Sequence, residues 1–411
     1  MRLVHTADWH LGQLLHGVSR AFEHDRFLAW LVDTLEAREA DALIVAGDVF
    51  DVASPSAVAL QQYYDFLAQV RRRLPDLDVV VVAGNHDSPA RIDAPADVLG
   101  TIGIHVVGAP HETRKAVPIH AKGEVAGWVL PVPFLRPRDL PAIEEADELG
   151  VDRAHGRLIE GHKKLYRELV ESVRSIAAPE HAIVATGHCY MAQGIVSELS
   201  ERKIQVGHQH ALPVDVFPRD IGYVALGHLH RAQIVGGRED VRYSGSPIPL
   251  SMIERGYEHQ VLQIDFDGPR VKSIEPIYVP RAVDLMCLPE EHAPLAEVIE
   301  KLRALPREAP DGADDRERPF LEVRVLREGA NPRLRRDVED AIAGAWVRLL
   351  RIDAKRPENE AAPEVPRTER LETLSPEDVF FAAYMRARAE PPNDALVQMF
   401  LALVEDVERG A

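Results

Sequence analysis

Five short apolar runs in the first 280 residues each end in residues that bind metal ions or turn the chain sharply. In chain order the runs are Arg2–Ala7, Ala42–Ala46, Val79–Ala83, Ala182–Thr186 and Gly222–Leu226. The residues that follow them are Asp8-Trp9-His10, Gly47-Asp48, Gly84-Asn85-His86, Gly187-His188 and Gly227-His228-Leu229-His230. Runs of this length and composition are typical of buried strands. Because the carboxyl ends of strands in an open α/β sheet meet at one crevice, we expect the five sets to form one site.

The spacing within the sets suits metal binding. In the first and last sets the two ligand-type residues are two positions apart, so both side chains lie on the same side of an extended backbone. Each of these pairs can therefore hold one ion. A glycine precedes four of the five sets, where it lets the backbone turn sharply and approach the site closely. One such fragment alone is usually a surface accident or a satisfied polar pair, whereas five in order predict a metal centre.

The rest of the chain divides by its patterns. Amphipathic helical spacing in Phe22–Arg38, Ser56–Leu74 and Leu158–Ile176 alternates with the runs and indicates an α/β layered domain over residues 1–280. Residues 281–352 alternate strand-like and helical segments, which predicts a small α+β domain. In order these segments are Ala282–Leu288, Leu295–Leu305, Phe320–Leu326, Pro332–Ala343 and Trp346–Ile352, the second and fourth being helical.

The last 59 residues have a different composition. Residues 353–372 are rich in Pro, Glu, Arg and Ala, with almost no apolar residue to bury, and are expected to form a linker. Residues 373–411 are expected to form two helices, the first starting at Ser375-Pro376-Glu377-Asp378 and the second after Pro391-Pro392-Asn393. Both have wide apolar faces and little core of their own. They are therefore expected to bind a partner, or, as the alternative, to pack back onto the 281–352 domain.

The formal net charge of −18 argues against a general polyanion binder. Any DNA contact would need a local basic surface, bound metal ions or a partner protein, and Arg20, Arg91 and Arg231 lie beside the motifs as candidates. No apolar run approaches the roughly 20 residues that a bilayer span requires. The chain shows no export signal, and Cys189 and Cys287 lie far apart. We therefore expect a cytoplasmic protein without membrane contact.

The order DxH, GD, GNH, GH, GHxH resembles the calcineurin-like metallophosphoesterases. The longer sequence motifs around these residues resemble those of the SbcD family of nucleases. They are HTADWHLG at 5–12, GDVFD at 47–51, AGNHDSP at 83–89, ALGHLHRAQ at 225–233 and YSGSPIPLS at 243–251. The resemblance covers the chain from start to end and is most specific in the first 280 residues. Two stretches depart from it, His188-Cys189-Tyr190 and His208–His210, and no metal role is assigned to the second.

The resemblance implies a layered metallophosphoesterase domain of the α/β class, a β-sandwich flanked by helices, with a small α+β capping domain and C-terminal helices. It implies one ion held by Asp8, His10, Asp48 and His230, and a second held by Asp48, Asn85, His188 and His228. Oxygen and imidazole ligands without a thiolate suit Mn²⁺ and are compatible with Fe or Zn, and two Mn²⁺ ions are expected. His86 would donate a proton to the leaving oxygen or stabilise the transition state. Asp51 would orient a ligand or, as the alternative, cap a helix.

The resemblance further implies a Mn²⁺-dependent DNA nuclease, a 3′–5′ double-strand exonuclease and single-strand endonuclease acting in double-strand-break repair and recombination. A homodimer would work with an SbcC-type, SMC-like ATPase bound through the C-terminal helices. This chain has no GxxxxGK[ST] motif, so the ATP site would be the partner's. The alternative is a phosphodiesterase or phosphatase for a small phosphoester, because one metal centre serves many substrates. A non-enzymatic scaffold is disfavoured because every expected ligand is present.

Helices at 56–74 and 90–102 are candidates for the dimer contact. They contain the apolar residues Tyr63, Phe66, Leu67, Val98 and Leu99. The alternative is that these helices simply cover the sheet, in which case their apolar residues belong to the core.

Overall fold

The computed structural model describes residues 1–110, 116–143, 153–192, 194–195, 211–327, 329, 331–355, 384 and 396 of the 411-residue chain. The described residues of Met1–Leu326 and Ala330–Ala354 belong to one compact unit. The divisions expected at residues 280, 352 and 372 stay predictions. Across the described ranges, no helix is long and apolar enough to cross a bilayer.

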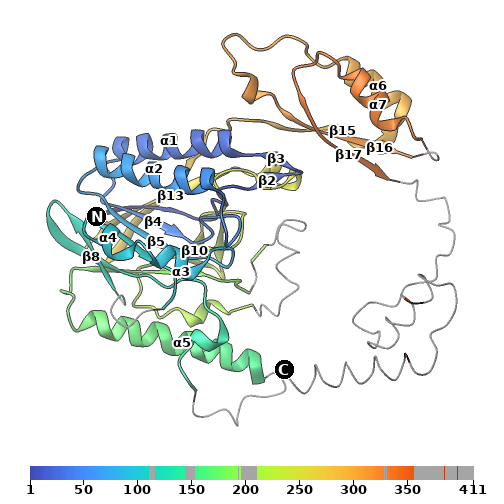
Figure 1. Ribbon diagram of the computed structural model, residues 1–411. Helices are drawn as coiled ribbons and strands as arrows, with labels where there is room; N and C mark the ends of the chain where they lie inside the picture. The colour runs from blue at the N-terminus through green and yellow to red at the C-terminus, as the bar shows by residue number, and fades with distance from the viewer. Residues whose placement is uncertain are drawn as a thin grey trace. The chain divides into compact units, whose positions relative to one another are not determined.

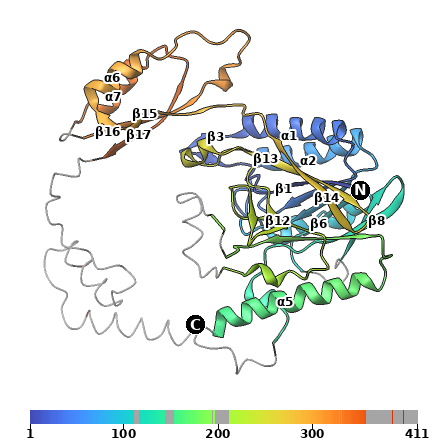
Figure 2. The same ribbon diagram turned by 180° about the vertical axis from the view of Figure 1, so that it is seen from behind.

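Residues 1–280 form a sandwich of two six-stranded sheets (Figures 1 and 2). The first sheet has the order β14 (Arg270–Tyr278), β13 (Gln260–Asp267), β1 (Arg2–Thr6), β4 (Ala42–Ala46), β5 (Asp78–Val82), β6 (Ile104–Val107). The second has the order β11 (Gln233–Val235), β12 (Arg238–Tyr243), β10 (Tyr223–Gly227), β9 (Ala182–His188), β8 (Glu124–Leu130), β7 (Val117–Ala121). The five predicted strands are the central β1, β4, β5, β9 and β10. We call this part the sandwich domain.

The residues of β4 show why the central strands read as unbroken apolar runs. Leu43 and Val45 face the helices outside the sheet, whereas Ala42 and Ile44 face the second sheet. Alternate side chains of a strand point to opposite faces, and here both faces are buried. Such a strand must be apolar at every position, so it is visible in the sequence.

Helices cover the outer faces of both sheets, as the resemblance implied (Figure 1). The first sheet packs against α1 (Ala21–Ala37) and α2 (Ala57–Arg73), and the second against α5 (Arg153–Arg174). The segment 90–102 forms two short helices, α3 (Pro89–Asp93) and α4 (Ala96–Gly100). Short elements complete the domain: β2 (Leu14–Leu15), β3 (Val18–Ser19), η1 (Pro137–Asp139), η2 (Val214–Val216) and η3 (Met252–Gly256).

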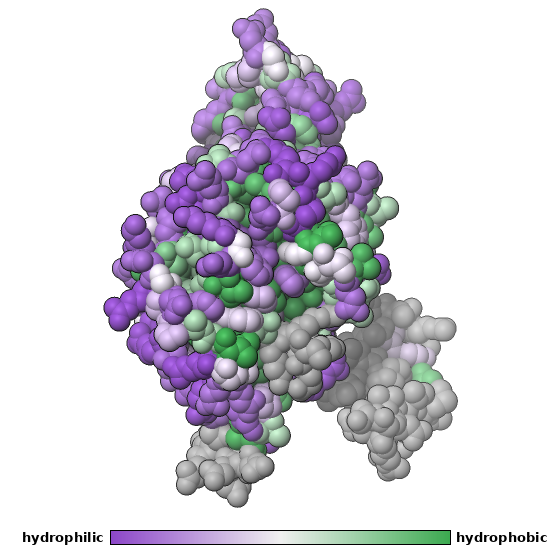
Figure 3. Space-filling view, turned by 90° about the vertical axis from the view of Figure 1, so that its left-hand side faces the viewer, coloured by the Kyte–Doolittle hydropathy of each residue, from purple (hydrophilic) through white to green (hydrophobic). Residues whose placement is uncertain are grey.

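The side chains considered for a dimer contact are mostly core residues. Tyr63, Phe66, Leu67 and Leu99 are buried in the cluster between the helices and the first sheet. Only Val98 is exposed, by 72%. The sheet-covering alternative therefore holds for the four buried side chains. On the face shown in Figure 3, the described apolar residues form small patches among polar ones, as is usual for a protein surface.

Residues 281–354, which we call the cap domain, form a three-stranded sheet with helices on one face. The order is β15 (Leu285–Pro294), β16 (Phe320–Leu326), β17 (Arg348–Lys355), and the helices are α6 (Leu295–Arg303) and α7 (Leu334–Ala341), with the short η4 (Asp315–Glu317). Leu321 and Val323 face the helices. Phe320, on the opposite face, packs with Leu15 and Met252 of the sandwich domain.

Candidate metal centre

The loops after the five central strands bring the predicted ligands together. Asp8, His10, Asp48, His188, His228 and His230 are all at most 5% exposed. Potential ligand atoms lie within 4.8 Å of one another in three groups, Asp8-His10-His230, Asp8-Asp48-His188 and His10-Asp51-His86. Backbone hydrogen bonds hold the loops in place, including Asp8 N–H to Gly47 O at 3.0 Å and His10 N–H to Asp48 O at 3.0 Å.

Asp48 lies between the two expected ligand sets. Its Oδ2 atom is 3.6 Å from His10 Nε2 and 3.3 Å from His188 Nε2. Its Oδ1 atom accepts the backbone N–H of His86 at 2.8 Å. Burial alone would raise the pKa of Asp48, but the nearby His188 outweighs burial and holds that pKa well below its usual range. Asp48 is therefore an ionised carboxylate that faces both sets.

The second set is arranged as a cation site. His188 Nδ1 donates to the backbone carbonyl of Ala46 at 2.9 Å, which leaves Nε2 facing Asn85 Oδ1 at 3.0 Å and Asp48 Oδ2 at 3.3 Å. Asn85 Oδ1 is also 3.0 Å from His228 Nδ1. An imidazole lone pair and two oxygens repel one another unless a proton or a metal ion lies between them. The residues present therefore fit a divalent ion.

The first set also fits a divalent ion. Among the described residues, the buried His10 Nε2 has no hydrogen-bond partner, while His10 Nδ1 is 3.3 Å from Asp51 Oδ1. Both oxygens of Asp8 receive the backbone N–H of His228, at 2.9 and 3.2 Å. Burial raises the pKa of Asp8. A metal ion would relieve the cost of burying this carboxylate and would use the lone pair of His10.

The backbone is strained at the ligand positions. Asp8, His10, Asp48 and His228 have φ angles of 56°, 48°, 50° and 108°, in the left-handed region that residues with a side chain rarely adopt. Each such residue costs roughly 1–3 kcal/mol and persists only where the surroundings enforce it. Four in one site indicate that the loops are held for a purpose other than stability.

The glycines before the ligands allow the close approach that the sequence predicted. Gly47 has φ 92°, and a Cβ added to it would lie 2.2 Å from His188 Nδ1. A Cβ on Gly84 would lie 2.1 Å from Asp48 Oδ1 and 2.3 Å from its backbone nitrogen. Because these atoms are fixed by burial, no side chain fits at either position.

Replacing Gly84 by Ala should therefore displace the Asp48 carboxylate and weaken metal binding by roughly tenfold or more, the loss seen when the surroundings of a ligand are changed. The matched control is Gly100→Ala, because nothing lies within 4 Å of a Cβ at that position. Titration of both variants with Mn²⁺ checks the expectation. Equal affinity of the two variants would show that Asp48 tolerates the displacement.

His86 and Asp51 occupy neighbouring positions beside the first set. His86 Nδ1 donates to the backbone carbonyl of Asp51 at 2.8 Å, and the rings of His10 and His86 lie 4.9 Å apart. The sequence could not assign this partner of His86. Asp51 holds His10 through its carboxylate, and Ser56, not Asp51, caps α2 by accepting the N–H of Ala59. The helix-capping alternative for Asp51 is therefore wrong.

Two buried carboxylates at the site were not predicted. Asp87 accepts the backbone N–H groups of Gly84 at 2.8 Å, Phe50 at 2.9 Å and Val49 at 3.1 Å, and so ties the second and third loops together. Burial, and then the charge of Asp48, raises the pKa of Asp87 to about 6. Asp87 directly follows His86 in the sequence, and this position could have marked it as part of the site. Glu254 approaches His230 from 24 residues further along the chain, with no motif to announce it.

One expectation about DNA contacts is wrong. Arg20 is fully buried, pairs with Glu23 at 2.6 Å and donates to Pro249 O at 2.7 Å, so it cannot reach a ligand in solvent. Arg91 and Arg231 are exposed. His208, His210 and, apart from Tyr384 and Leu396, the segment 373–411 expected to form the C-terminal helices lie outside the described residues.

Metal binding should depend steeply on pH. Burial lowers the pKa of His188, but Asp48 outweighs burial and raises that pKa to about 9, above the ordinary 6.5. In the metal-free fold, His188 therefore keeps a proton that it would lose in the unfolded chain, and this proton stabilises the fold. The stabilisation is full below pH 6.5 and is lost as the pH rises through 9. An ion at Nε2 must displace this proton. Between pH 6.5 and 9, Mn²⁺ affinity should thus rise by up to about tenfold per pH unit. A Mn²⁺ affinity that does not change over this pH range would contradict the expectation.

Known proteins resemble the chain in both domains. The family model for calcineurin-like phosphoesterases matches residues 1–232, and one described as the type 5 capsule protein repressor C-terminal domain matches residues 281–387. The SbcD subunit of the SbcCD nuclease of Rhodobacter capsulatus is 39% identical over 93% of this chain and 94% of its own. The Escherichia coli K12 protein of that name is 32% identical over 92% of both chains. The Bacillus subtilis protein is 37% identical over 64% of this chain and 66% of its own.

Proposed function

Because this chain belongs to the SbcD nucleases of the calcineurin-like phosphoesterase family, and is thus a metal-dependent nuclease, we propose that it cuts DNA with two Mn²⁺ ions. The proposed activities are 3′–5′ exonuclease on double strands and endonuclease on single strands, in double-strand-break repair and recombination. The observation that carries the proposal is the position of Asp48, whose Oδ2 faces His10 Nε2 on one side and His188 Nε2 on the other.

The ions would be held as the motifs imply. Asp8, His10, Asp48 and His230 would hold one, and Asp48, Asn85, His188 and His228 the other. When bound, two such ions lower the pKa of a water molecule and offset the charge that develops on the scissile phosphate. The ionised Asp48 reduces the repulsion between them. The imidazole-rich ligand set favours Mn²⁺ over the harder Mg²⁺.

His86 would supply the proton for the leaving oxygen. Its Nδ1 is engaged by the carbonyl of Asp51, so the ring is fixed and Nε2 is the nitrogen left to face the substrate. His86 is only partly buried, as is the neighbouring Asn85, so a bound strand can reach it. A positioned acid of this kind contributes roughly 10²–10⁴-fold to the rate.

The competing function is hydrolysis of a small phosphoester at the same centre. The two functions can be separated by measuring turnover of three substrates, namely DNA, a chromogenic phosphodiester and a phosphomonoester. Each is measured in Mn²⁺, in Mg²⁺ and in EDTA. We expect EDTA to abolish activity, Mn²⁺ to restore it better than Mg²⁺, and DNA to be cut. Full activity in EDTA, or a monoester turned over faster than any diester, would reject the proposal.

We further propose a homodimer that binds an SbcC-type, SMC-like ATPase in the cytoplasm. The names of the relatives, which denote one component of a nuclease, support a partner. The net charge of −18 supports one as well, because this chain alone attracts DNA poorly. Cys189 and Cys287 are both free, as suits a reducing compartment.

Deleting residues 371–411 should remove the ATPase but not the nuclease. The apolar faces expected for its two helices consist of Val379, Phe380, Tyr384, Met385, Leu396, Met399, Phe400, Leu403 and Val407. The truncated chain should remain a folded dimer that cleaves simple DNA ends or single strands with Mn²⁺, yet no longer co-purify with the ATPase. Leu403→Glu in the full chain is a milder variant with the same expected result. Aggregation of the truncated chain, or undiminished ATPase binding, would refute the docking assignment.

A further inference from the structure

The short turn η3 carries a fully buried carboxylate that touches one of the expected metal ligands. Glu254 Oε1 lies 3.1 Å from His230 Nδ1. Its Oε2 accepts the backbone N–H of Leu250 at 2.8 Å, and the Ser251 hydroxyl donates to Oε1 at 3.2 Å. The carboxylate is therefore fixed in position before it meets the imidazole.

This contact determines which nitrogen of His230 faces the centre. When Glu254 is a carboxylate it can only accept from His230, so that His230 Nδ1 is the donor and the lone pair is on Nε2. His230 lies in one group of potential ligand atoms with Asp8 and His10. A partner that fixes ring orientation in this way typically changes metal affinity by about 10–100-fold.

The residues around Glu254 contact the cap domain. Met252 is 3% exposed and packs with Val283, Leu285 and Phe320. Arg255 Nη2 pairs with Glu290 of β15 at 2.6 Å. The turn that holds Glu254 is thus attached to the cap domain by an apolar contact and by an ion pair.

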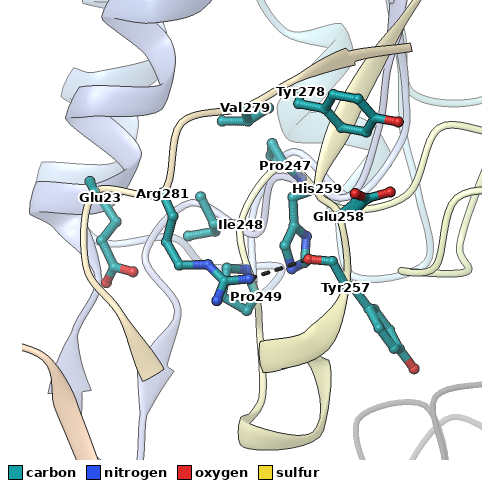
Figure 4. A pocket seen from close by; sticks show the side chains of 11 residues that line it. Glu23, Pro247, Ile248, Pro249, Tyr257, Glu258, His259, Tyr278, Val279 and Arg281 are labelled. Carbon is teal, nitrogen blue, oxygen red and sulfur yellow. Dashed lines mark hydrogen bonds between the residues drawn. The ribbon is translucent and has the colours of Figure 1, made fainter. Parts of the chain in front are cut away.

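A third attachment lies where the chain passes from one domain to the other. Arg281 donates to the backbone carbonyl of Tyr257 at 3.2 Å, and the N–H of Tyr257 in turn donates to the carbonyl of Glu254 at 2.9 Å (Figure 4). Beside this contact is a cavity of about 220 Å³, lined in part by Pro247, Pro249 and Val279.

We propose that Glu254 is a positioning residue for His230, and that the cap domain sets this position through the turn η3. The inference rests on the proposed two-metal function and extends it. The cap domain then acts on the metal centre itself, in addition to any contact it makes with DNA. A cap domain that only binds DNA would leave metal affinity and the turnover of a small diester unchanged.

The first test is Glu254→Gln in the full chain. The Gln side chain has the same shape, but one of its two ends is an NH₂ group, which only donates. If this group faces His230 Nδ1–H or Leu250 N–H, two donors meet, so one of the two contacts is lost. Mn²⁺ affinity, measured from the electron paramagnetic resonance signal of free Mn²⁺, should fall roughly 10–100-fold. In the metal-free protein, nitrogen NMR of labelled histidines should show a changed proportion of the Nδ1–H form of His230. Unchanged affinity together with an unchanged tautomer would overturn the proposal.

The second test separates coupling from DNA binding. Met252→Ala and Arg281→Ala change attachments of the turn without touching a ligand, and should weaken Mn²⁺ binding by roughly 2–30-fold, the range of coupling between linked sites. Turnover of a small diester at limiting Mn²⁺ should fall in parallel. The matched control is Arg316→Ala, which removes a different contact between the domains, the stacking of Arg316 on Phe22 at 4.6 Å, and should leave affinity unchanged.

The outcomes are distinguishable from a failure of the proposed function. If Met252→Ala and Arg281→Ala both match the wild type, the role of the cap domain is refuted even where Glu254→Gln has its effect. If Arg316→Ala weakens binding as much as they do, the effect is general loosening and the specific link is refuted. If the wild type binds no Mn²⁺, the two-metal function fails, while the NMR spectrum still reports whether Glu254 fixes His230.

Discussion

Replacing Asp48 by Ala is expected to remove both metal ions and to reduce cleavage by roughly 10³-fold or more, beyond the 10²–10³ lost with one electrostatic donor in other enzymes. The reason is geometric. Asp48 Oδ2 is within 3.6 Å of His10 Nε2 and 3.3 Å of His188 Nε2, so neither ligand set is complete without it. Loss of the carboxylate also leaves the repulsion between two ions unscreened.

Metal content by mass spectrometry and turnover of a small diester together check this expectation. The matched control is Asp78→Ala, which removes another buried aspartate of the same sheet. Asp78 begins β5, at the strand end opposite to the ligand loop, and its Oδ2 accepts the backbone N–H of His120 at 2.7 Å. That variant should lose stability and keep its metal. Full metal occupancy in Asp48→Ala would show that Asp48 is not the shared ligand.

Replacing His86 by Ala should slow DNA cleavage by roughly 10²-fold or more while both ions stay bound. His86 donates its Nδ1–H to the carbonyl of Asp51, which fixes the ring and leaves Nε2 as the nitrogen that can give a proton to the leaving oxygen. The expected signature is a dependence on the leaving group. A nitrophenyl diester has a leaving group that needs no proton, so the variant should slow its cleavage much less than the cleavage of DNA.

Two results would contradict the role of His86. A loss of metal in His86→Ala would mean that it is a ligand, as the third group of atoms with His10 and Asp51 allows. An equal loss on DNA and on the nitrophenyl diester would mean that it stabilises the phosphate and donates no proton.

The fold was predictable where strands are buried on both faces. The range expected for β4 agrees with the structure, because an unbroken apolar run has clear ends. The range expected for β16 agrees as well, although Glu322 and Arg324 interrupt its apolar residues. The cap strand β15 was expected to end at Leu288 but continues to Pro294. Its second half carries Glu290, Glu291 and His292, which are not fully buried, so nothing in its polarity marks a strand. The edge strand β14 has the same polar character and was not predicted.

The site was predictable in its ligands but not in what supports them. Ligands at strand ends follow from the topology, because parallel strands deliver their carboxyl ends to one edge. The contact of Glu254 with His230 depends on the path of a long loop, which no local pattern encodes. Arg20 was misjudged because a charged residue beside a motif suggests an exposed one. Glu23, three residues later on the same helical side, was the available sign of a buried pair.

The most direct test of two-metal binding is a crystal of the full chain soaked in Mn²⁺ and measured at the manganese absorption edge. We expect two anomalous peaks, one on each side of Asp48. One peak should lie among Asp8, His10, Asp48 and His230, and the other among Asp48, Asn85, His188 and His228. A single peak, or a peak held by His10, Asp51 and His86, would contradict it.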